Sequence, residues 1–210
     1  MKKRVIKSRL PVIKKYCKNK VVLDIGCVAH KADKEKNTYW LHKQIRKVAK
    51  KIVGIDIQEE EVKKLVKKGY DIRVGNAEEI GLKNRNFEVV VAGEFIEHIS
   101  NKGKFLENMY NHLSKEGVLI LTTPSLFALR YQIRNLFSGK IVPNKEHVCW
   151  FDFYTLKNLC ERHGFLLKKS YYHFNTDTPW YKYFPVRMAT FLRKNYAPRI
   201  LFVLEKKRLE

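Results

Sequence analysis

The sequence predicts an α/β protein: a doubly wound, Rossmann-like sheet of seven strands, mostly parallel with a final antiparallel strand, and helices on both faces. Two observations carry this prediction. Apolar runs rich in β-branched residues alternate with longer segments of helical period, which is typical of a parallel sheet covered by helices. The 210 residues are 45% hydrophobic, which is enough for one core, and no repeat or low-complexity tract divides them. We therefore expect a single domain over residues 1–210.

Five elements are expected in the first part of the chain. Strands are predicted over residues 21–26, 51–57 and 71–77, where β-branched residues cluster. Between these strands, apolar side chains recur at helical spacing over residues 38–50 and 59–69, and a glycine closes the second of these helices. The alternation fits the parallel sheet.

The second part of the chain continues the alternation. Strands are expected at residues 87–94, 118–124, 165–174 and 199–207, and helices at 102–117 and 152–164. Pro124 is placed to end one strand, because proline cannot donate to a sheet ladder. Asp152 is a typical N-cap residue for the last large helix.

Three segments lie outside this shared plan, and we expect ligand specificity to come from them. Residues 1–19 form a basic N-terminal arm, and residues 125–146 read as an inserted amphipathic cap. Residues 171–197 form an aromatic and basic insertion before the last strand. The rings of that insertion either stack on sugars or bases, enter an interface, or pack as a cap over the sheet edge.

The charge of the chain is strongly positive. There are 43 Lys and Arg against 21 Asp and Glu, a formal net charge of +22. Such a surface attracts polyanions, so RNA, an anionic lipid surface and phosphorylated sugar carriers are candidate partners. The alternative is that the lysines, which lie along the whole chain, reflect an A/T-rich coding bias and solvated faces.

Cysteine usage and hydropathy predict a cytoplasmic protein. The N-terminus is basic but lacks the uninterrupted apolar run of a signal peptide, and we expect no transmembrane segment. The four cysteines lack C-x-x-C spacing, so we expect reduced thiols at Cys17, Cys27, Cys149 and Cys160.

Three successive strand ends carry residues suited to an adenosine ligand. In an open α/β sheet the ligand crevice lies beyond the carboxyl ends of the strands. The first strand ends in Asp24 and Gly26, where a missing Cβ lets the backbone approach a ligand. Asp56 is placed to accept hydrogen bonds from ribose hydroxyls, and Asn76 with Ala77 to border an adenine edge. Alone, Gly26 could be a simple turn and Asp56 a helix cap; together they indicate an adenosine site.

A dinucleotide site fits less well. The loop after the first strand is G-C-V-A-H and lacks the G-x-G-x-x-G pattern that holds a pyrophosphate. Asp24 would repel a pyrophosphate and suits a ligand that carries an ammonium and a sulfonium. The spacing from Gly26 to Asp56 also exceeds the roughly 20 residues of the dinucleotide fingerprint.

Six ordered motifs resemble the class I S-adenosylmethionine-dependent methyltransferases, in the broad set that includes the ubiquinone-pathway enzymes. They are VVLDIGC, IVGIDI, VGNAEEI, FEVVVAGEFIEHI, LSKEGVLILTTP and HVCWFDFYTLKNLCERHGF. The resemblance covers about residues 20–168 and 200–207. It implies S-adenosylmethionine as cofactor, and it says little about the methyl acceptor because the family spans many substrates.

The resemblance assigns cofactor roles to seven residues. The residues beside the methionine part are Asp24, Gly26 and Cys27, the ribose carboxylate is Asp56, and the residues at the adenine are Ile57, Asn76 and Ala77. This sequence departs from the family pattern in two places: Val28 replaces the second glycine of D-x-G-x-G, and Asn76 stands where Asp is commoner. Val28 suggests a differently shaped loop, for which His30 could compensate.

The segment after the fourth expected strand reads E-x-x-E-H. In a helical turn, Glu94, Glu97 and His98 would share one face, and two carboxylates with an imidazole suit a divalent cation. The segment is similar to the metal-binding segment of ubiquinone-pathway O-methyltransferases and small-RNA 2′-O-methyltransferases, and His147 is similar in position to a later histidine ligand there. The hypothesis is that these four residues hold Mg²⁺ or a similar ion. In the alternative, Glu94 bonds the cofactor side, and His98 or His147 is a general base or a packed histidine.

The expected activity is methyl transfer to a hydroxyl. His98 is the first candidate base and His147 the second, because a hydroxyl acceptor must lose its proton. The leading hypothesis is O-methylation of a small-molecule or glycan-type acceptor. The alternatives are an RNA methyltransferase, favoured by the charge, and a cofactor-binding, non-catalytic regulatory module, suggested by the missing second glycine.

Overall fold

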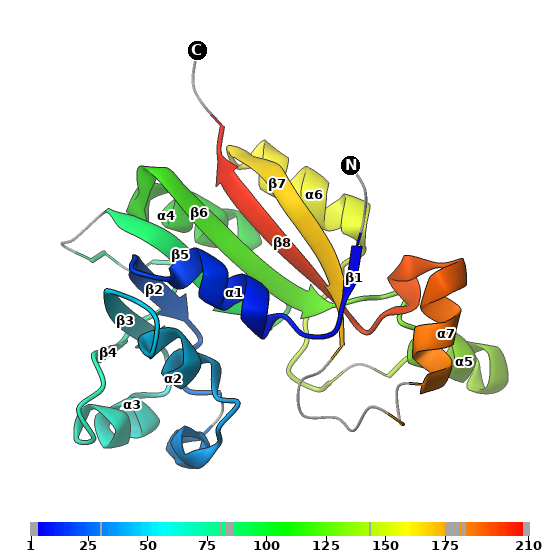
Figure 1. Cartoon of the computed structure of the whole chain (residues 1–210), viewed down its shortest axis with the longest axis horizontal. Coiled ribbons are helices and arrows are strands. Elements are labelled where there is room, and N and C mark those ends of the chain that lie inside the picture. Colours follow the sequence, from blue (N-terminus) through cyan, green and yellow to red (C-terminus); the bar gives the residue numbers. More distant parts are fainter. Residues whose placement is uncertain are drawn as a thin grey trace.

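The computed structural model describes residues 4–29, 31–79, 81–82, 86–142, 144–174, 181 and 184–207. Eight strands form one sheet (Figure 1) in the order β1-β7-β8-β6-β5-β2-β3-β4. They are β1 (Arg4–Ile6), β2 (Val21–Ile25), β3 (Lys51–Asp56), β4 (Ile72–Val74), β5 (Phe87–Gly93), β6 (Leu113–Pro124), β7 (Phe165–His173) and β8 (Arg199–Lys206). Only β8 is antiparallel to its neighbours β6 and β7, so the predicted fold class is confirmed.

The strand order reverses between β2 and β5. From β2 the chain proceeds outward through β3 to β4, then returns to place β5 on the other side of β2. In doubly wound sheets a ligand crevice opens at this reversal, outside the carboxyl ends of the strands. The fold therefore directs attention to the ends of β2, β3 and β5.

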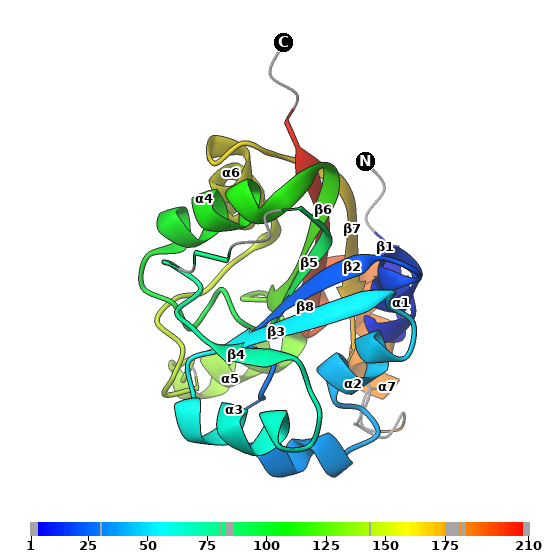
Figure 2. The ribbon, with the colours of Figure 1, turned by 90° about the vertical axis from the view of Figure 1, so that its left-hand side faces the viewer.

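Two helical layers cover the sheet. The helices are α1 (Leu10–Cys17), α2 (Leu41–Arg46), α3 (Glu59–Val66), α4 (Lys102–His112), α5 (Leu129–Ser138), α6 (Phe153–Arg162) and α7 (Phe184–Leu192), with short 3-10 turns η1 (Ala32–Lys36) and η3 (Lys194–Tyr196). Figure 2 shows α4 and α6 on one face of the sheet and α1 with α2 on the other.

Side chains of the central strands point alternately into two cores. In β5, Val90 and Ala92 belong to the core under α4 and α6, whereas Val89 and Val91 belong to the core under α1 and α2. Successive side chains of a strand point to opposite faces, so a strand covered on both sides must be apolar throughout. This explains the continuous apolar run VVVA over residues 89–92, whereas Glu88 before it is only partly buried.

The sheet has one strand more than expected. Residues 4–6 of the expected N-terminal arm form β1 and pair in parallel with β7, with Arg4 opposite Tyr171. Residues 10–17 of that arm form α1, whose Ile13 and Cys17 are fully buried. A three-residue strand has too few positions to show a periodic pattern, which is why the sequence did not predict it.

Several element boundaries differ from the expectation. The helix expected to end at residue 117 ends at His112, and β6 begins at Leu113. The helix expected over 38–50 is α2 alone, preceded by the turn η1. The expected N-cap is present: Asp152 accepts hydrogen bonds from the backbone N–H groups of Tyr154 and Thr155, which forms a capping box.

The two expected insertions contain helices α5 and α7. Residues 171–173 belong to β7, and most of the aromatic stretch that follows lies outside the described residues. None of the helices in the described part of the chain is long and apolar enough to cross a bilayer.

Candidate active site

The predicted cofactor residues lie on three neighbouring strand ends. The backbone N–H of Gly26 donates to the carbonyl of Ile55 at 2.8 Å, which joins the end of β2 to β3. The N–H of Gly75 donates to the carbonyl of Asp56 at 3.0 Å, which joins β3 to the end of β4. The parallel register thus brings these positions to one edge of the sheet, as the sequence predicts.

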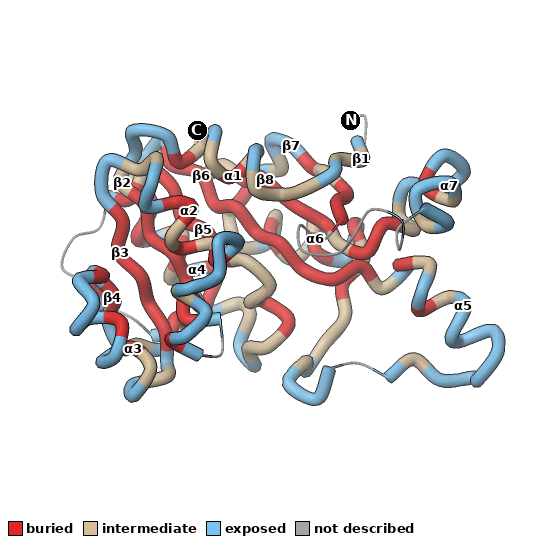
Figure 3. Tube along the Cα trace, turned by 60° about the horizontal axis from the view of Figure 1, so that its bottom comes forward, coloured by how far each residue is buried: buried red, intermediate tan, exposed pale blue. Residues whose placement is uncertain are grey.

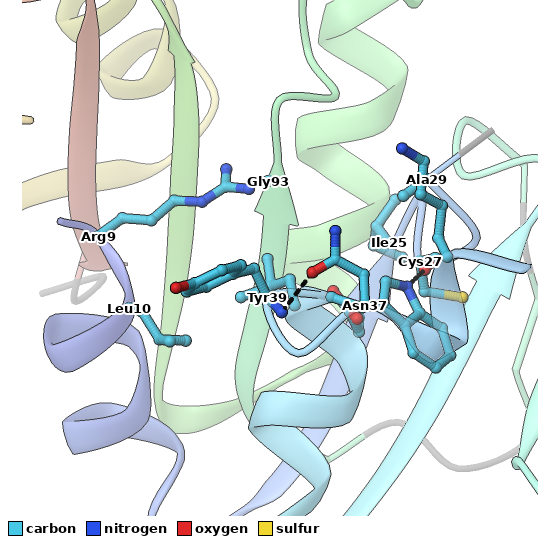
Figure 4. A pocket seen from close by; sticks show the side chains of 13 residues that line it. Arg9, Leu10, Ile25, Cys27, Ala29, Asn37, Tyr39 and Gly93 are labelled. Atoms are coloured by element: carbon cyan, nitrogen blue, oxygen red, sulfur yellow. Dashed lines mark hydrogen bonds between the residues drawn. The ribbon is translucent and has the colours of Figure 1, made fainter. Parts of the chain in front are cut away.

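A pocket of about 240 Å³ opens at this edge. Asp24, Gly26 and Cys27 line it, whereas Asp56, Ile57, Asn76 and Ala77 are not among its lining residues. The remaining walls come from β2 and the loop after it, the start of α1, the segment from η1 to the start of α2, and the end of β5. They are Arg9, Leu10, Ile25, Ala29, Lys34, Asn37, Tyr39, Trp40, Leu41 and Gly93. Figure 4 shows Arg9 reaching over the end of β5 toward Gly93, with Tyr39 and Asn37 on the opposite wall.

Gly26 adopts a conformation that requires glycine. Its φ is +68°, in the left-handed region that side chains disfavour. A Cβ at this position would lie 2.7 Å from Cδ2 of Phe95, which follows the end of β5. The turn therefore keeps the backbone of β2 close to the E-x-x-E-H segment.

Asp24 has a partner within the protein. Its side chain is 2% exposed, and its Oδ2 lies 2.9 Å from Nδ1 of His42 in α2. His42 is itself buried against the rings of Trp40 and Tyr70. Asp24 therefore fixes α2 against β2 while it also lines the pocket.

Asp56 fixes two turns of the backbone. Its Oδ2 accepts from the N–H of Val28 at 2.9 Å, and its Oδ1 accepts from the N–H of Gln58 at 3.1 Å. The second bond ends at Gln58, which is the N-cap residue of α3 and has no side-chain cap, so Asp56 shapes the turn before the helix and the helix-capping interpretation is wrong. Each carboxylate oxygen keeps a further acceptor position.

The loop after β2 takes its shape without the second glycine of the family pattern. Val28 is fully buried in a small core with Val62 and Leu65 of α3. Nε1 of Trp40 donates to the carbonyl of Cys27 at 2.7 Å, which closes the loop. Ala29, and not residue 28, takes the left-handed conformation, with φ of +56°. His30 lies outside the described residues.

The three predicted adenine neighbours occupy different environments. Ile57 is 71% exposed directly after β3, which leaves an apolar side chain open to a ligand. Asn76 is exposed, and its Oδ1 accepts from the N–H of Glu78 at 3.0 Å. Ala77 is 4% exposed and its side chain packs in the core, so its methyl group is turned away from solvent.

Glu94 belongs to an ion pair with two arginines. Its carboxylate lies 3.5 Å from Nη1 of Arg9 and bonds Nε of Arg199. Burial alone would raise the pKa of Glu94, but Arg199 and Arg9 outweigh burial and lower the pKa to about 2. Arg9 also donates to Oγ1 of Thr122 at 2.6 Å. Glu94 thus anchors the N-terminal segment over the ends of β5 and β6.

The other three residues of the metal hypothesis come together. Ligand atoms of Glu97, His98 and His147 all lie within 4.8 Å of one another, and Glu94 is outside this cluster. The rings of His98 and His147 meet edge to face at 4.7 Å. The N–H of Val148 donates to the carbonyl of Glu97 at 2.9 Å, which holds the later histidine against the segment that follows β5.

Two atoms of this cluster are buried without a hydrogen-bond partner among the described residues: Oε1 of Glu97 and Nδ1 of His147. Oε2 of Glu97 accepts from the hydroxyl of Thr123 at 3.0 Å. Burial, with the charge of Glu94, raises the pKa of Glu97 to about 8, and burial lowers the pKa of His147. An unpaired carboxyl oxygen and an unpaired imidazole nitrogen are suited to bind a substrate hydroxyl, or a cation that displaces the proton of Glu97.

Sequence reasoning missed Arg9, Tyr39 and Arg199. Arg9 and Arg199 are 190 residues apart in the sequence and meet on one glutamate only because α1 and β8 both begin near the ends of β5 and β6. No local motif marks such a pair. Tyr39 lines the pocket from the loop before α2, and no motif in the sequence marks this position.

The chain matches a protein-family model described as a methyltransferase domain over residues 2–169, which is well over half of its length. It therefore belongs to the methyltransferase-domain family, and the prediction of an S-adenosylmethionine-dependent methyltransferase fold is confirmed at this level. The family implies S-adenosylmethionine as the cofactor.

Two relatives of this chain are named for different activities. The mitochondrial ubiquinone biosynthesis O-methyltransferase of Rattus norvegicus is 28% identical over 159 residues, which are 68% of this chain and 43% of that protein. A tRNA U34 carboxymethyltransferase of Campylobacter jejuni is 28% identical over 158 residues, which are 70% of this chain and 49% of that protein. The chain thus spans less than half the length of these relatives.

A solved structure supports the fold alone. An S-adenosylmethionine-dependent methyltransferase from Archaeoglobus fulgidus superimposes with a TM-score of 0.65 at 20% identity, covering 95% of this chain and 91% of that one.

Proposed function

We propose that the protein is an S-adenosylmethionine-dependent methyltransferase that acts on a hydroxyl of a small-molecule or glycan-type acceptor. One observation carries the proposal. The segment after β5 contacts the Gly26 turn through Phe95, and two and three residues later it supplies Glu97 and His98 to a cluster with unpaired polar atoms. A cofactor pocket and a candidate catalytic cluster are therefore built on one short segment.

The cofactor supplies an activated methyl group on a sulfonium. The residues present fit it: a turn without a Cβ at Gly26, the acidic Asp24 in the pocket wall, and the exposed apolar Ile57 beyond β3. Arg9 adds a cation at the opposite wall, where it suits the carboxylate of the methionine part. Asp56 with its free acceptor positions is assigned to the ribose, Cys27 to the methionine part, and Asn76 to the adenine.

The acceptor hydroxyl must lose a proton as the new bond forms. His98 is the first candidate to hold that proton and His147 the second, because their rings meet beside the unpaired oxygen of Glu97. Burial lowers the pKa of His147, so this imidazole is neutral near pH 7 and can accept a proton. A positioned base contributes about 10² to 10⁴ in rate.

The same cluster fits a divalent cation. Glu97, His98 and His147 would hold Mg²⁺ or a similar ion, and a bound cation would acidify the acceptor hydroxyl. The paired Glu94 is not needed as a ligand, since its charge is neutralised by Arg9 and Arg199. The proposal is therefore a three-residue site in place of the four-residue site expected from the motif.

The test separates binding from transfer. Calorimetry with S-adenosylhomocysteine measures the cofactor site, and transfer of a labelled methyl group to a panel of phenolic, catecholic and sugar hydroxyls measures the reaction. Binding with transfer to a hydroxyl supports the proposal. Failure to bind the cofactor overturns it, and binding without transfer to any acceptor class favours a non-catalytic regulatory module.

RNA methylation is the second candidate function. The net charge of +22 and the named tRNA substrate of the Campylobacter jejuni relative favour it. Affinity for tRNA that falls steeply with salt, together with methyl transfer to tRNA, would establish it over the first candidate. Cytoplasmic location, expected from the sequence, is tested by fractionation of the cells that produce the protein.

A further inference from the structure

Helices α5 and α7 carry apolar side chains on their outer faces. In α5, Ile133, Leu136 and Phe137 are 48%, 79% and 83% exposed. In α7, Met188, Phe191 and Leu192 are 53%, 84% and 86% exposed. Both triplets have the spacing i, i+3, i+4, so each forms a stripe along one side of its helix. We call these six side chains the α5–α7 surface.

The α5–α7 surface lies at one end of the molecule. Both helices project from the same end of the sheet in Figures 1 and 3, away from β2, β3 and β4. In a soluble helix the apolar stripe normally faces the core. Here the buried residue of α5 is Tyr131, on another side of the helix, while the stripe faces out. Exposed apolar patches of this kind mark interaction sites.

Every charged residue in the two segments that contain these stripes is basic, although Asp152 lies nearby and lines one hollow with Leu192, Arg193 and Lys194. Residues 125–142 and 184–198 contain no Asp or Glu. The exposed cations are Arg130, Arg134, Lys140, Arg187, Arg193 and Lys194. Apolar side chains flanked by Lys and Arg are the pattern of helices that lie in the interface of an anionic bilayer.

We propose that the α5–α7 surface docks on an anionic lipid bilayer. The apolar stripes enter the boundary between headgroups and acyl chains, and the flanking cations bind lipid phosphates. A second copy of the chain fits this surface poorly, because a symmetric interface would bring two sets of cations together. RNA fits it less well, because four of the six side chains, Ile133, Leu136, Met188 and Leu192, are aliphatic and offer a base no aromatic ring to stack on.

The docked surface is connected to the candidate active site. The ring of Tyr131 in α5 meets that of Trp150 at 4.6 Å, and Trp150 meets His147 at 6.2 Å. Docking would therefore bring the histidine cluster near the bilayer and favour an acceptor held in lipid. This last point rests on the proposed function, whereas the docking itself does not.

Vesicle sedimentation tests the docking without cofactor or acceptor. The full chain is mixed with vesicles of phosphatidylcholine alone or of an equimolar mixture with phosphatidylglycerol. We expect binding to the anionic vesicles that weakens with salt. Leu136→Ser with Phe137→Ser, and separately Phe191→Ser with Leu192→Ser, should weaken it about tenfold or more. The matched control, Val66→Ser with Leu166→Ser, changes side chains that are 49% and 40% exposed elsewhere and should leave binding unchanged.

Two double variants that remove cations extend the same test. Arg134→Gln with Lys140→Gln should weaken anionic binding about tenfold, whereas Lys47→Gln with Lys67→Gln, exposed cations outside α5 and α7, should have little effect. Equal loss in both pairs would reduce the effect to net charge and overturn the assigned surface. Two other outcomes would also overturn the proposed docking surface. In the first, the apolar variants sediment with vesicles as the wild type does; in the second, they convert a dimer to a monomer while no variant binds lipid. Calorimetry with S-adenosylhomocysteine confirms that each variant is folded, and loss of methyl transfer with docking retained would count against the proposed function alone.

Discussion

Buried polar atoms are bonded differently in two regions of the molecule. We call the strand ends that carry Asp24 and Asp56 the cofactor edge, and Glu97, His98 and His147 the histidine cluster. At the cofactor edge, the carboxylate of Asp24 is paired with His42, and that of Asp56 accepts two backbone N–H groups. In the cluster, Oε1 of Glu97 and Nδ1 of His147 have no hydrogen-bond partner within the described part of the chain. Both sites lie beyond the carboxyl ends of the parallel strands, so the sheet alone does not explain the difference.

The difference indicates what each region does before a ligand arrives. Paired carboxylates hold loops and helices in position, so the cofactor edge is organised by the protein itself. An unpaired buried acceptor costs free energy of about 1 to 3 kcal/mol unless a ligand or ion satisfies it. The cluster is therefore the region where an external group is expected to complete the structure.

The largest effect is expected from the cluster. His98→Ala should reduce the methyl transfer rate by about 10² to 10⁴, because a positioned base contributes that much. Affinity for S-adenosylhomocysteine should change little, since His98 does not line the cofactor pocket. Single-turnover transfer and calorimetry measure the two quantities on the same preparation. An equal loss of affinity and rate would place His98 in the cofactor site and remove the distinction between the regions.

Substitutions of the two glutamates in the E-x-x-E-H segment should have different effects, one on stability and the other on ion binding. Glu94→Gln removes the carboxylate that Arg9 and Arg199 share, and removing one partner of a buried pair costs about 3 kcal/mol or more. Glu97→Gln should lower affinity for Mn²⁺, measured by calorimetry, with a smaller loss of stability in urea unfolding. The two variants are matched controls for each other. Loss of Mn²⁺ binding in Glu94→Gln, with wild-type stability, would restore the four-residue site.

Gly26→Ala tests the cofactor edge. The added Cβ meets Phe95 at 2.7 Å and the residue has φ of +68°, so we expect cofactor affinity to fall roughly 100-fold, as about 1 to 3 kcal/mol of strain would produce. Gly69→Ala is the matched control, because Gly69 also has positive φ, at +82°, but a Cβ there meets nothing within 4 Å in the described chain. Calorimetry with S-adenosylhomocysteine compares the two. Equal effects would mean that backbone strain alone, and not the contact with Phe95, controls the site.

The sequence predicts the strands and their ends better than it predicts the contacts between distant segments. Apolar periodicity is a local property, and it located the ends of β2 and β3 to within one residue and the motif after β5. It placed the end of β4 at residue 77, whereas the strand ends at Val74. The pairing of Arg9 and Arg199 on Glu94 depends on the order of strands in the sheet, which no local pattern carries. The same limit explains Ala77: strand position is predictable from sequence, but the direction of one side chain after the strand depends on the turn that follows.

The smallest effect concerns His173, which tests whether every unpaired buried atom marks a site. Its Nε2 has no hydrogen-bond partner among the described residues, yet it is 1% exposed and lies outside the cluster. Burial lowers its pKa from 6.5 to about 4. The unfolded chain therefore binds this proton first as the pH falls, and the stability contributed by neutral His173 is present above about pH 6.5 and is lost progressively toward pH 4.

His173→Gln should remove this part of the pH dependence. The difference in unfolding free energy between wild type and variant should change by about 2 kcal/mol between pH 7 and pH 5, to the disadvantage of the wild type at pH 5. Wild type and variant must be compared with each other, because the pKa of Glu97 is raised to about 8 and its protonation stabilises both proteins as the pH falls through the same range. Urea unfolding across that range gives both curves. A constant difference would show that folding leaves the pKa of His173 unchanged, and loss of methyl transfer in His173→Gln at full stability would mark its unpaired nitrogen as part of the active site.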